Sequence, residues 1–199
     1  MVRSSTSHCL PMRAQVIARG LLEGAYNSRL MPVDRDRYRQ LAGSFPTGVT
    51  IVTTRGTDGT PRGLTTQSFV GLSTQPPLMM VSIDKSSRTL PVLKNARSFV
   101  INFLKQGAED VSTRFASKED DKFAGIPWRP STACDGAPIL HESVVAYAEC
   151  RITKQQEEGD HWIFIGEVEG GEVFGGAPLM YYHRTYTAWP EEKPAPQVG

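Results

Sequence analysis

The sequence has few of the residues that build metal centres and disulfide frameworks. It contains three cysteines, an odd number without CxxC spacing, and four histidines without HxH, HExxH or HxxxH spacing. We therefore expect no metal site and no disulfide framework, and a reducing, cytoplasmic setting. No apolar run approaches the roughly 20 residues of a membrane-spanning helix, so we expect no contact with a membrane.

An excess of charge of one sign is also lacking. The 199 residues carry 22 basic and 21 acidic side chains, which gives a net charge of +1 and no basic surface for nucleic acid. The motifs GxSxG, GxxxxGKS or GxxxxGKT, and GxGxxG after a strand are absent, so the commonest hydrolase, nucleotidase and Rossmann signals are missing. The partner is then expected to be a small molecule or another protein.

Composition divides the chain into three parts. Residues 1–33 contain four arginines and one acidic residue, which is typical of a transit peptide, of a disordered or non-native extension, or of a start codon assigned too early. Residues 34–188 are long enough for one core and are expected to form one domain. Residues 189–199 are rich in proline and predict a flexible tail.

Strand patterns predominate within the predicted domain, with a few short helices between them. Asp34 is a plausible N-cap for a first helix, and Ser117 with Asp120 predicts a capping box for a later helix that ends near Gly125. Leu90 and Leu93 indicate a helix of about two turns. The expected strands are residues 49–54, 64–73, 78–83, 99–104, 143–153, 160–168 and 178–186. Together they predict a mainly β fold, a closed antiparallel barrel with short helices.

Two polar clusters interrupt this apolar pattern. The stretch GLTTQSFVGLS, residues 63–73, places hydroxyls and an amide in a row, which suits a flat ligand with polar edges such as an isoalloxazine, but a solvent-facing strand has the same pattern. In DKSSRT, residues 84–89, hydroxyls and cations surround the start of a predicted helix. This arrangement favours a phosphate site or, equally, simple capping by Ser87 or Thr89.

His161 stands between a glycine-aspartate turn and a strongly apolar strand that we expect to be central in the sheet. Taken alone, it is best interpreted as a histidine that forms a hydrogen bond with Asp160. Cys150 alternates with apolar neighbours on a strand predicted to have one buried face, and Glu149 is placed on the opposite face. Arg114 lies near a helix C-terminus, where it can act as a dipole partner.

Several motifs occur together in the order and spacing of one family. They are FPTGVTIVTT, GLTTQSFVGLSTQPPLMMVSIDKSSRT, FVINFL, RFASKEDDKFAGIPW, GAPIL, GDHWIFIGEV and PLMYYHRTY. From Arg35 to Tyr186 the chain resembles the flavin reductase family, and more narrowly the short-chain reductase components of two-component flavin-dependent monooxygenases, the 4-hydroxyphenylacetate and phenol hydroxylase type. The resemblance implies a flavin-binding split barrel, antiparallel with Greek-key connections, that forms a homodimer.

The resemblance also implies a site for FAD or FMN, with NADH or NADPH as co-substrate. His161 is expected beside the nicotinamide, where it positions that ring. Gln67 stands where the family usually has Ala, Ser or Asn, which leaves the contact at N5 or O4 of the flavin open. The residues implied in cofactor binding are Thr47, Gly48, Val49, Gln67, Ser68, Phe69, Ser73, Thr74, Asp84, Lys85, Ser86, Ser87, Thr89, Arg114, Phe115, His161 and His183, with Lys122 and Phe123 flanking them.

The function implied is that of an NAD(P)H-dependent flavin reductase. It would reduce flavin by hydride transfer and supply diffusible reduced flavin to a cognate flavin-dependent monooxygenase, by a transient encounter or by diffusion. Two alternatives remain open on the residues: a flavin oxidase of the pyridoxamine-phosphate-oxidase kind, and a flavin-binding protein without catalytic activity.

Overall fold

The computed structural model describes residues 33–189, and its contacts divide the chain into two units, Met1–Ala42 and Gly43–Gly199. The predicted extension and tail lie outside the described residues, apart from Val33 and Trp189. Helix α2 (Arg35–Gly43) begins where it was predicted. The Arg37 amide donates a hydrogen bond of 2.7 Å to the Asp34 carboxylate, so the predicted N-cap is confirmed. None of the residues of α2 is buried.

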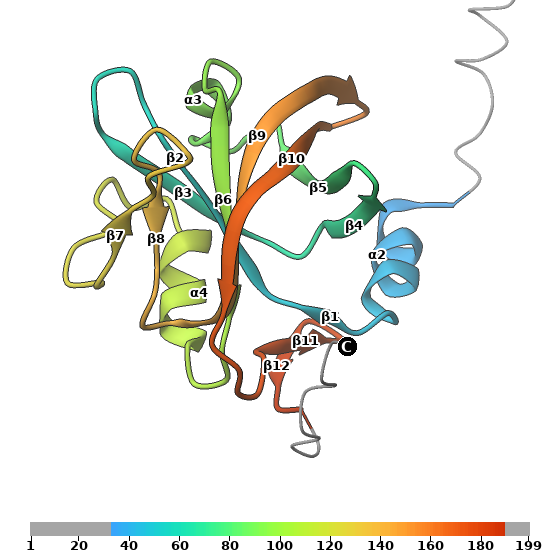
Figure 1. Cartoon of the computed structure of the whole chain (residues 1–199). Helices are drawn as coiled ribbons and strands as arrows, with labels where there is room; N and C mark the ends of the chain where they lie inside the picture. The colour runs from blue at the N-terminus through green and yellow to red at the C-terminus, as the bar shows by residue number, and fades with distance from the viewer. Residues whose placement is uncertain (1–32, 190–199) are drawn as a thin grey trace, which may run out of the picture. The chain divides into compact units, whose positions relative to one another are not determined.

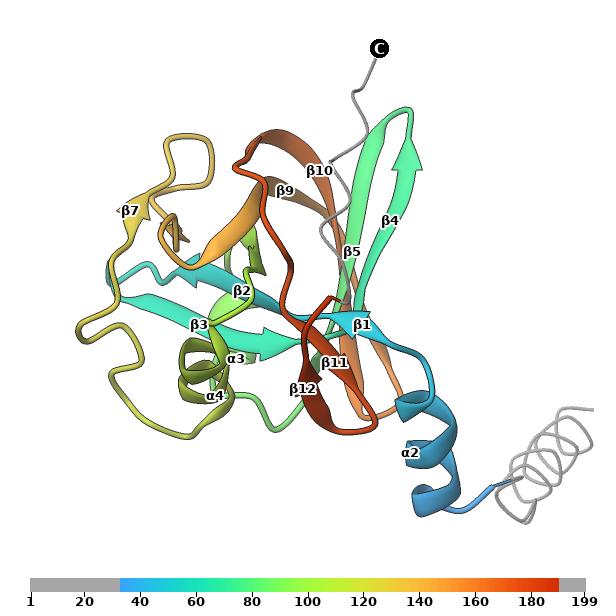
Figure 2. The ribbon, with the colours of Figure 1, turned by 90° about the horizontal axis from the view of Figure 1, so that it is seen from below.

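The second unit is built on a seven-stranded antiparallel sheet (Figures 1 and 2). Its strands are β2 (Thr50–Arg55), β3 (Pro61–Thr66), β4 (Phe69–Thr74), β5 (Pro77–Asp84), β6 (Ser98–Leu104), β9 (Val144–Glu158) and β10 (His161–Val173). Their order is β3-β2-β6-β9-β10-β5-β4. The mainly β, antiparallel prediction is confirmed, and β10 is an inner strand as expected. The closed barrel is not found, because β3 and β4 end the order as edge strands.

Smaller elements cover the ends of this sheet. They are β1 (Thr47–Gly48), α3 (Leu90–Leu93), α4 (Glu109–Ala116), β7 (Arg129–Pro130), β8 (Pro138–Ile139), β11 (Met180–Tyr182) and β12 (Thr185–Thr187). Strands β1, β11 and β12 form a second sheet, so the predicted single strand 178–186 is a hairpin that turns at His183 and Arg184, both with positive φ. Between residues 33 and 189, no helix combines the length and the apolar character needed to cross a membrane.

Two helix predictions are wrong. Helix α3 has four residues, one turn instead of the expected two. No helix follows Ser117, because its hydroxyl donates to the Arg114 carbonyl at 2.8 Å and accepts from the Glu119 amide, which ends α4 and leads into a loop.

Strand β9 packs its predicted inner face against the core. Ala148 and Cys150 lie in one cluster with Phe99 and Phe164, and this part of the prediction is confirmed. The expectation that the opposite face is not buried is wrong at Glu149: this residue is only 8% exposed and accepts a 2.5 Å hydrogen bond from the Ser131 hydroxyl. The loop that follows β7 covers this face of β9, which a strand pattern alone does not reveal.

Three main-chain hydrogen bonds join the small sheet to the large one. The Val49 amide donates to the Leu179 carbonyl at 3.0 Å, the Leu179 amide to the Leu104 carbonyl at 2.8 Å, and the Leu104 amide to the Val49 carbonyl at 3.0 Å. All three residues are at most 2% exposed. This junction of Val49, Leu104 and Leu179 fixes the place where β1 and the segment before β11 meet the ends of β2 and β6.

A second link ties the edge strand β3 to β5, which lies next to the other edge strand. The Thr66 hydroxyl, at the end of β3, donates to the Ser82 carbonyl on β5 at 3.3 Å and accepts from the Ser68 amide at 3.1 Å. The Ser82 amide donates to the Ser68 carbonyl at 3.1 Å. The chain therefore leaves β3 at Gln67 and crosses directly to the opposite edge of the sheet.

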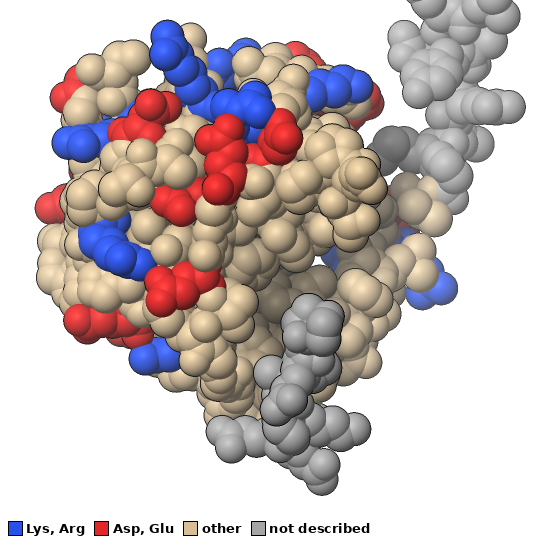
Figure 3. All heavy atoms as spheres, viewed as in Figure 1, with Lys and Arg blue, Asp and Glu red and all other residues tan. Residues whose placement is uncertain are grey.

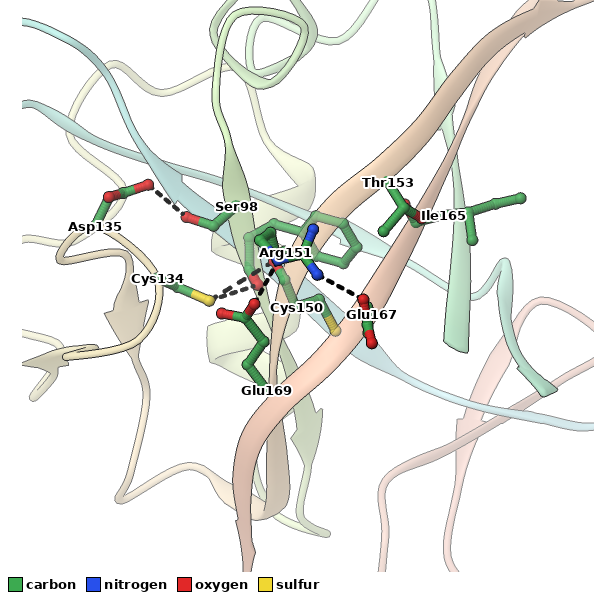
Figure 4. Close-up of polar contacts among 10 residues, drawn as sticks. Ser98, Cys134, Asp135, Cys150, Arg151, Thr153, Ile165, Glu167 and Glu169 are labelled. Atoms are coloured by element: carbon green, nitrogen blue, oxygen red, sulfur yellow. Dashed lines mark hydrogen bonds and ion pairs between the residues drawn. The ribbon is translucent and has the colours of Figure 1, made fainter. Parts of the chain in front are cut away.

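Cys134 and Cys150 lie close together in the core beside β6 (Figure 4). The Cys134 thiol is 3.5 Å from the Phe99 carbonyl and 3.7 Å from the Cys150 carbonyl. Burial raises the pKa of Cys134 to about 11 and that of Cys150 to about 12. On the exposed surface, Arg151 of β9 forms ion pairs with Glu167 and Glu169 of β10.

Because the thiolate is the reactive form of cysteine, these two thiols should be inert in the folded protein near neutral pH. We expect a disulfide reagent such as DTNB to label neither thiol in a native Cys9→Ser variant and both after guanidinium is added. The absorbance of the released thiolate measures this. Rapid labelling of the native variant would contradict the burial described above.

Candidate functional site

A pocket of about 390 Å³ opens where the small sheet meets the large one. Its volume is within the range of small-molecule sites, about 300 to 1,000 Å³. Five of the predicted cofactor residues line it: Thr47, Gly48, Val49, Gln67 and Phe69. The other lining residues are Phe45, Pro46, Thr50, Phe103, Leu104, Val145, Ala146, Pro178 and Leu179. We call this the apolar pocket.

Strand ends from both sheets position the walls of the apolar pocket. Thr47 and Gly48 belong to the small sheet and Thr50 to the large one, so the chain crosses the pocket floor at Val49. Phe69 and Phe103 meet edge to face, with ring centroids 4.9 Å apart and planes at 84°. Gln67 lies in the break between β3 and β4, where its side chain is exposed.

The apolar pocket contains no charged lining residue. The Thr47 hydroxyl is buried and has no hydrogen-bond partner among the described residues, which is unusual for a polar atom in a folded protein. A Cβ atom placed on Gly48 would meet nothing within 4 Å, so its backbone is open to a ligand. These features suit a flat, mostly apolar ligand that carries hydrogen-bonding atoms along an edge.

A second pocket, of about 350 Å³, lies at the start of β3, whereas Gln67 of the apolar pocket follows the end of that strand. Its lining residues are Pro61, Arg62, Gly63, Arg88, Thr89, Glu119, Asp120, Lys122 and Phe123. It therefore contains Thr89, which was predicted to bind cofactor, and both predicted flanking residues. We call this the charged pocket.

The Gly63 carbonyl organises the charged pocket. It accepts hydrogen bonds from the Thr89 hydroxyl at 3.0 Å and from the Lys122 ammonium at 3.4 Å. Lys122 also donates to the Phe115 carbonyl at 2.7 Å. Burial, with the nearby Arg88 charge, lowers the pKa of Lys122. Three basic side chains, Arg62, Arg88 and Lys122, and two acidic ones, Glu119 and Asp120, line the pocket, and Arg88 is paired with Asp120 at 2.8 Å. The excess of one positive charge makes this pocket suited to an anionic group such as phosphate.

The turn after β5 carries four more predicted residues. The Asp84 carboxylate accepts from the Ser86 amide at 2.6 Å, and the Asp84 carbonyl accepts from the Ser87 amide at 3.0 Å. Asp84 is the register partner of His161, the first residue of β10. The turn that begins at Asp84 therefore lies directly beside the predicted nicotinamide residue.

His161 combines the two interpretations of its sequence position. Its Nδ1 atom is 2.6 Å from the Asp160 carboxylate, and its side chain is 38% exposed. The hydrogen bond to His161 lowers the pKa of Asp160. The imidazole is thus held through one nitrogen, while the ring remains accessible for a further contact.

The remaining predicted residues lie outside both pockets. Ser73 and Thr74 pair with Leu78 and Pro77 at the far end of β4, and Ser68 contributes only main-chain atoms to the sheet crossing described above. His183 is exposed in the turn between β11 and β12.

Arg114 and Phe115 support the loop and the wall beneath the charged pocket. Arg114 donates to the Ala124 carbonyl at 2.5 Å and so anchors the loop after α4. The Phe115 side chain is 0% exposed and therefore belongs to the core, where its ring meets that of Phe123 edge to face. Neither side chain faces a pocket as a cofactor ligand would.

The sequence did not reveal the apolar lining contributed by β6, β9 and the segment before β11, because such residues look like ordinary core. Phe103, Ala146 and Pro178 are examples. Gly63 did carry a signal that was not used, since a glycine inside a strand often marks the close approach of another group. Here that group is the ring of Phe115.

The family model and the relatives that match this chain are all described as flavin reductases or reductase subunits. A family model described as "Flavin reductase like domain" matches residues 42–190. The flavin reductase (NADH) of Kitasatospora aureofaciens is 44% identical over 165 residues, which cover 81% of this chain and 85% of that protein. The reductase subunit HsaB of a flavin-dependent monooxygenase from Mycobacterium tuberculosis is 40% identical over 167 residues, covering 82% of this chain and 87% of the relative.

Solved structures with a similar fold include the NADH:FAD oxidoreductase SgcE6 of Streptomyces globisporus C-1027, in complex with NAD and FAD fragments. It superposes with a TM-score of 0.74 at 32% identity, and the match covers 84% of this chain and 98% of that one.

The crowding at Gly63 generates a stability prediction. A Cβ atom at this position would lie 2.6 Å and 2.9 Å from two carbons of the buried Phe115 ring, which has no free space into which to move. We expect Gly63→Ala to lower the free energy of unfolding by about 1 to 3 kcal/mol, measured by urea denaturation.

The matched control is Gly48→Ala on strand β1, where an added Cβ atom meets nothing within 4 Å. This variant should unfold at nearly the wild-type urea concentration. Equal destabilisation of both variants would show that the effect comes from strand glycines in general and not from contact with Phe115.

Proposed function

This chain belongs to the flavin reductase family, and we propose that it uses NADH or NADPH to reduce FAD or FMN and supplies the reduced flavin to a separate flavin-dependent monooxygenase. The observation that carries this proposal is the apolar pocket, whose size and unpartnered Thr47 hydroxyl fit an isoalloxazine ring. The bound flavin supplies the redox chemistry, since it accepts a hydride from the nicotinamide.

On the flavin side, the chain's own residues mainly bind and orient. The Thr47 hydroxyl gains the hydrogen bond that it otherwise lacks, and the open backbone at Gly48 approaches the ring edge. The exposed Gln67 amide lies at the mouth of the pocket, where it can reach a polar atom of the ring. Phe69 and Phe103 supply the apolar wall and exclude water.

The absence of charged lining residues in the apolar pocket favours release of the product. Reduced flavin is anionic near N1 and O2, and a lysine or arginine beside those atoms would hold it tightly. Among the described lining residues there is no such cation. A reductase that supplies a diffusible product needs only moderate affinity, and this pocket is consistent with that requirement.

On the nicotinamide side, His161 orients the ring. Its Nδ1 atom is engaged by Asp160, so Nε2 is the nitrogen left to contact the nicotinamide. Ser86 and Ser87, together with Thr89 and Lys122 in the charged pocket, are the groups that we assign to the flavin phosphate. The names of the relatives support NADH and FAD as the preferred pair.

The fold is best interpreted as a split barrel with Greek-key connections. The Thr66 and Ser68 contacts with Ser82 bring the β3 edge against β5, so the seven-stranded sheet curls back on itself without continuous pairing of its edges. This gap between the two edges lies next to the apolar pocket, which Gln67 lines.

The edge strand β4 supports a homodimer. Val70 and Leu72 are each 44% exposed on β4, which pairs only with β5 and contains no charged residue. In the view of Figure 3, most charged side chains lie over the left and upper parts of this face, and few lie at the centre right, where Figure 1 places β4 and β5. An uncharged apolar edge strand is a liability unless it is covered, and a second copy of the chain is the cover that we propose.

Sedimentation equilibrium tests this assembly. We expect the wild-type mass to be twice that of one chain and Leu72→Asp to be monomeric, because a charge on the edge strand opposes pairing. As a control, Val173→Asp alters an apolar residue that is 79% exposed on another strand and should leave the dimer intact. A monomeric wild type would refute the homodimer.

Anaerobic stopped-flow tests the function. On mixing with NADH and FAD, we expect the absorbance of oxidised flavin to disappear over many turnovers and the reduced flavin to be captured by an added oxygenase. Reduced flavin that stays bound through turnover, or flavin that is not reduced at all, would refute the proposal. Parallel assays with FMN and with NADPH establish the preferred pair.

Two variants in the same assay locate the two halves of the site. Thr47→Val keeps the shape without the hydroxyl and should weaken flavin binding by about two- to ten-fold, the worth of one hydrogen bond. His161→Ala should raise the KM for NADH more than it weakens flavin binding. Equal effects of both variants on both ligands would contradict this division.

A further inference from the structure

The β9–β10 hairpin tip holds His161 in place by contacts that come from another part of the chain. Strand β9 ends at Glu158 and β10 begins at His161, with a turn at Gly159 that has a φ of +57°. Strand pairing with Glu158 and Asp84 fixes the His161 backbone on both sides. The turn residues themselves have no such ladder and need another support.

Lys85 provides this support. Its amide donates to the Asp160 carbonyl at 3.0 Å, and its ammonium donates to the Gly159 carbonyl at 2.6 Å and to the Glu157 carboxylate at 2.5 Å. One residue thus contacts three of the four residues that precede His161. The Lys85 side chain is 38% exposed, and its hydrogen bond lowers the pKa of Glu157.

These contacts conflict with the role that the family resemblance suggested for Lys85. An ammonium group has three donors, and two of them are already directed to the hairpin. The Lys85 charge is also balanced by the Glu157 carboxylate. In the charged pocket, the Lys122 ammonium contacts the neutral carbonyls of Gly63 and Phe115, so it is better placed than Lys85 to balance the charge of a phosphate. The phosphate of the flavin therefore does not need Lys85, whereas the hairpin turn does.

We propose that Lys85 is a positioning residue for His161: it clamps the hairpin tip and so aims the imidazole at the nicotinamide. The inference rests on the proposed function, because it assumes that His161 contacts that ring. It assigns Lys85 to NADH use instead of flavin binding. Glu157, 72 residues away in the sequence, accepts the hydrogen bond from Lys85 and so contributes to the same positioning of His161.

Lys85→Met tests this assignment, because it keeps most of the aliphatic stem and removes the charge. We expect the KM for NADH to rise about two- to five-fold, the range of a partly exposed ion pair. The ratio of FMN to riboflavin affinity should not change, since riboflavin lacks only the phosphate. Lys85→Arg should recover part of the NADH effect, and His161→Ala gives the upper limit.

Glu157→Gln is the partner variant and should reproduce the Lys85→Met effect. The double variant should be no worse than either single one, because both remove the same contact. Glu158→Gln is the matched control: it makes the same change in charge on the same hairpin, at a carboxylate that contacts Gln156 and not Lys85. If Lys85→Met fails to fold, Glu157→Gln alone decides the question.

Hydrogen–deuterium exchange supplies a readout that is independent of activity. Amides of residues 157–163 should exchange faster in Lys85→Met and Glu157→Gln than in the wild type or in Glu158→Gln. A wild type that does not reduce flavin would defeat the proposed function, and the exchange result would still show whether Lys85 clamps the tip. Two results would overturn the proposal. One is a Lys85→Met variant whose affinity for FMN falls relative to its affinity for riboflavin, and the other is an unchanged KM for NADH in an active Lys85→Met enzyme.

Discussion

The hydroxyl of Thr66 joins the edge strand β3 to β5, the neighbour of the other edge strand, and the arrangement of the site follows from that contact. It donates across to Ser82 on β5 and accepts from Ser68, so β3 and β4 are separated by a break of two residues. The break places Gln67 beside the apolar pocket. Three residues before Thr66 on strand β3, Gly63 lines the charged pocket, and its carbonyl accepts the hydrogen bond from Thr89. One short segment therefore separates two sites of opposite character.

That opposition suits the two chemical parts of a flavin nucleotide. The pocket lined by Thr47, Phe69 and Phe103 offers shape and the unpartnered Thr47 hydroxyl, while the pocket lined by Arg88 and Lys122 offers charge. Affinity that resides largely in the charged pocket does not depend on the redox state of the ring, because phosphate is unchanged by reduction. A protein with this division binds oxidised and reduced flavin with similar affinity, so it does not hold its product more tightly than its substrate.

The sequence predicted those features that depend on neighbouring residues. The Asp34 cap and the inner position of β10 follow from capping and apolar patterns, and Thr47 and Gln67, which line the apolar pocket, were named because motifs carry them. Features that depend on distant residues were missed or wrong. Glu149 is buried by a loop that includes Ser131, and Lys85 meets a carboxylate far along the chain. No local pattern reveals either contact.

The junction of Val49, Leu104 and Leu179 makes the pocket floor tolerant of evolutionary drift. Its hydrogen bonds are all between main-chain groups, so they demand a particular path of the backbone and not particular side chains. Substitution of one aliphatic residue by another of similar size leaves such bonds in place. Selection can therefore alter the residues that face the ligand while the platform beneath them persists, which is how one scaffold can serve many oxygenases.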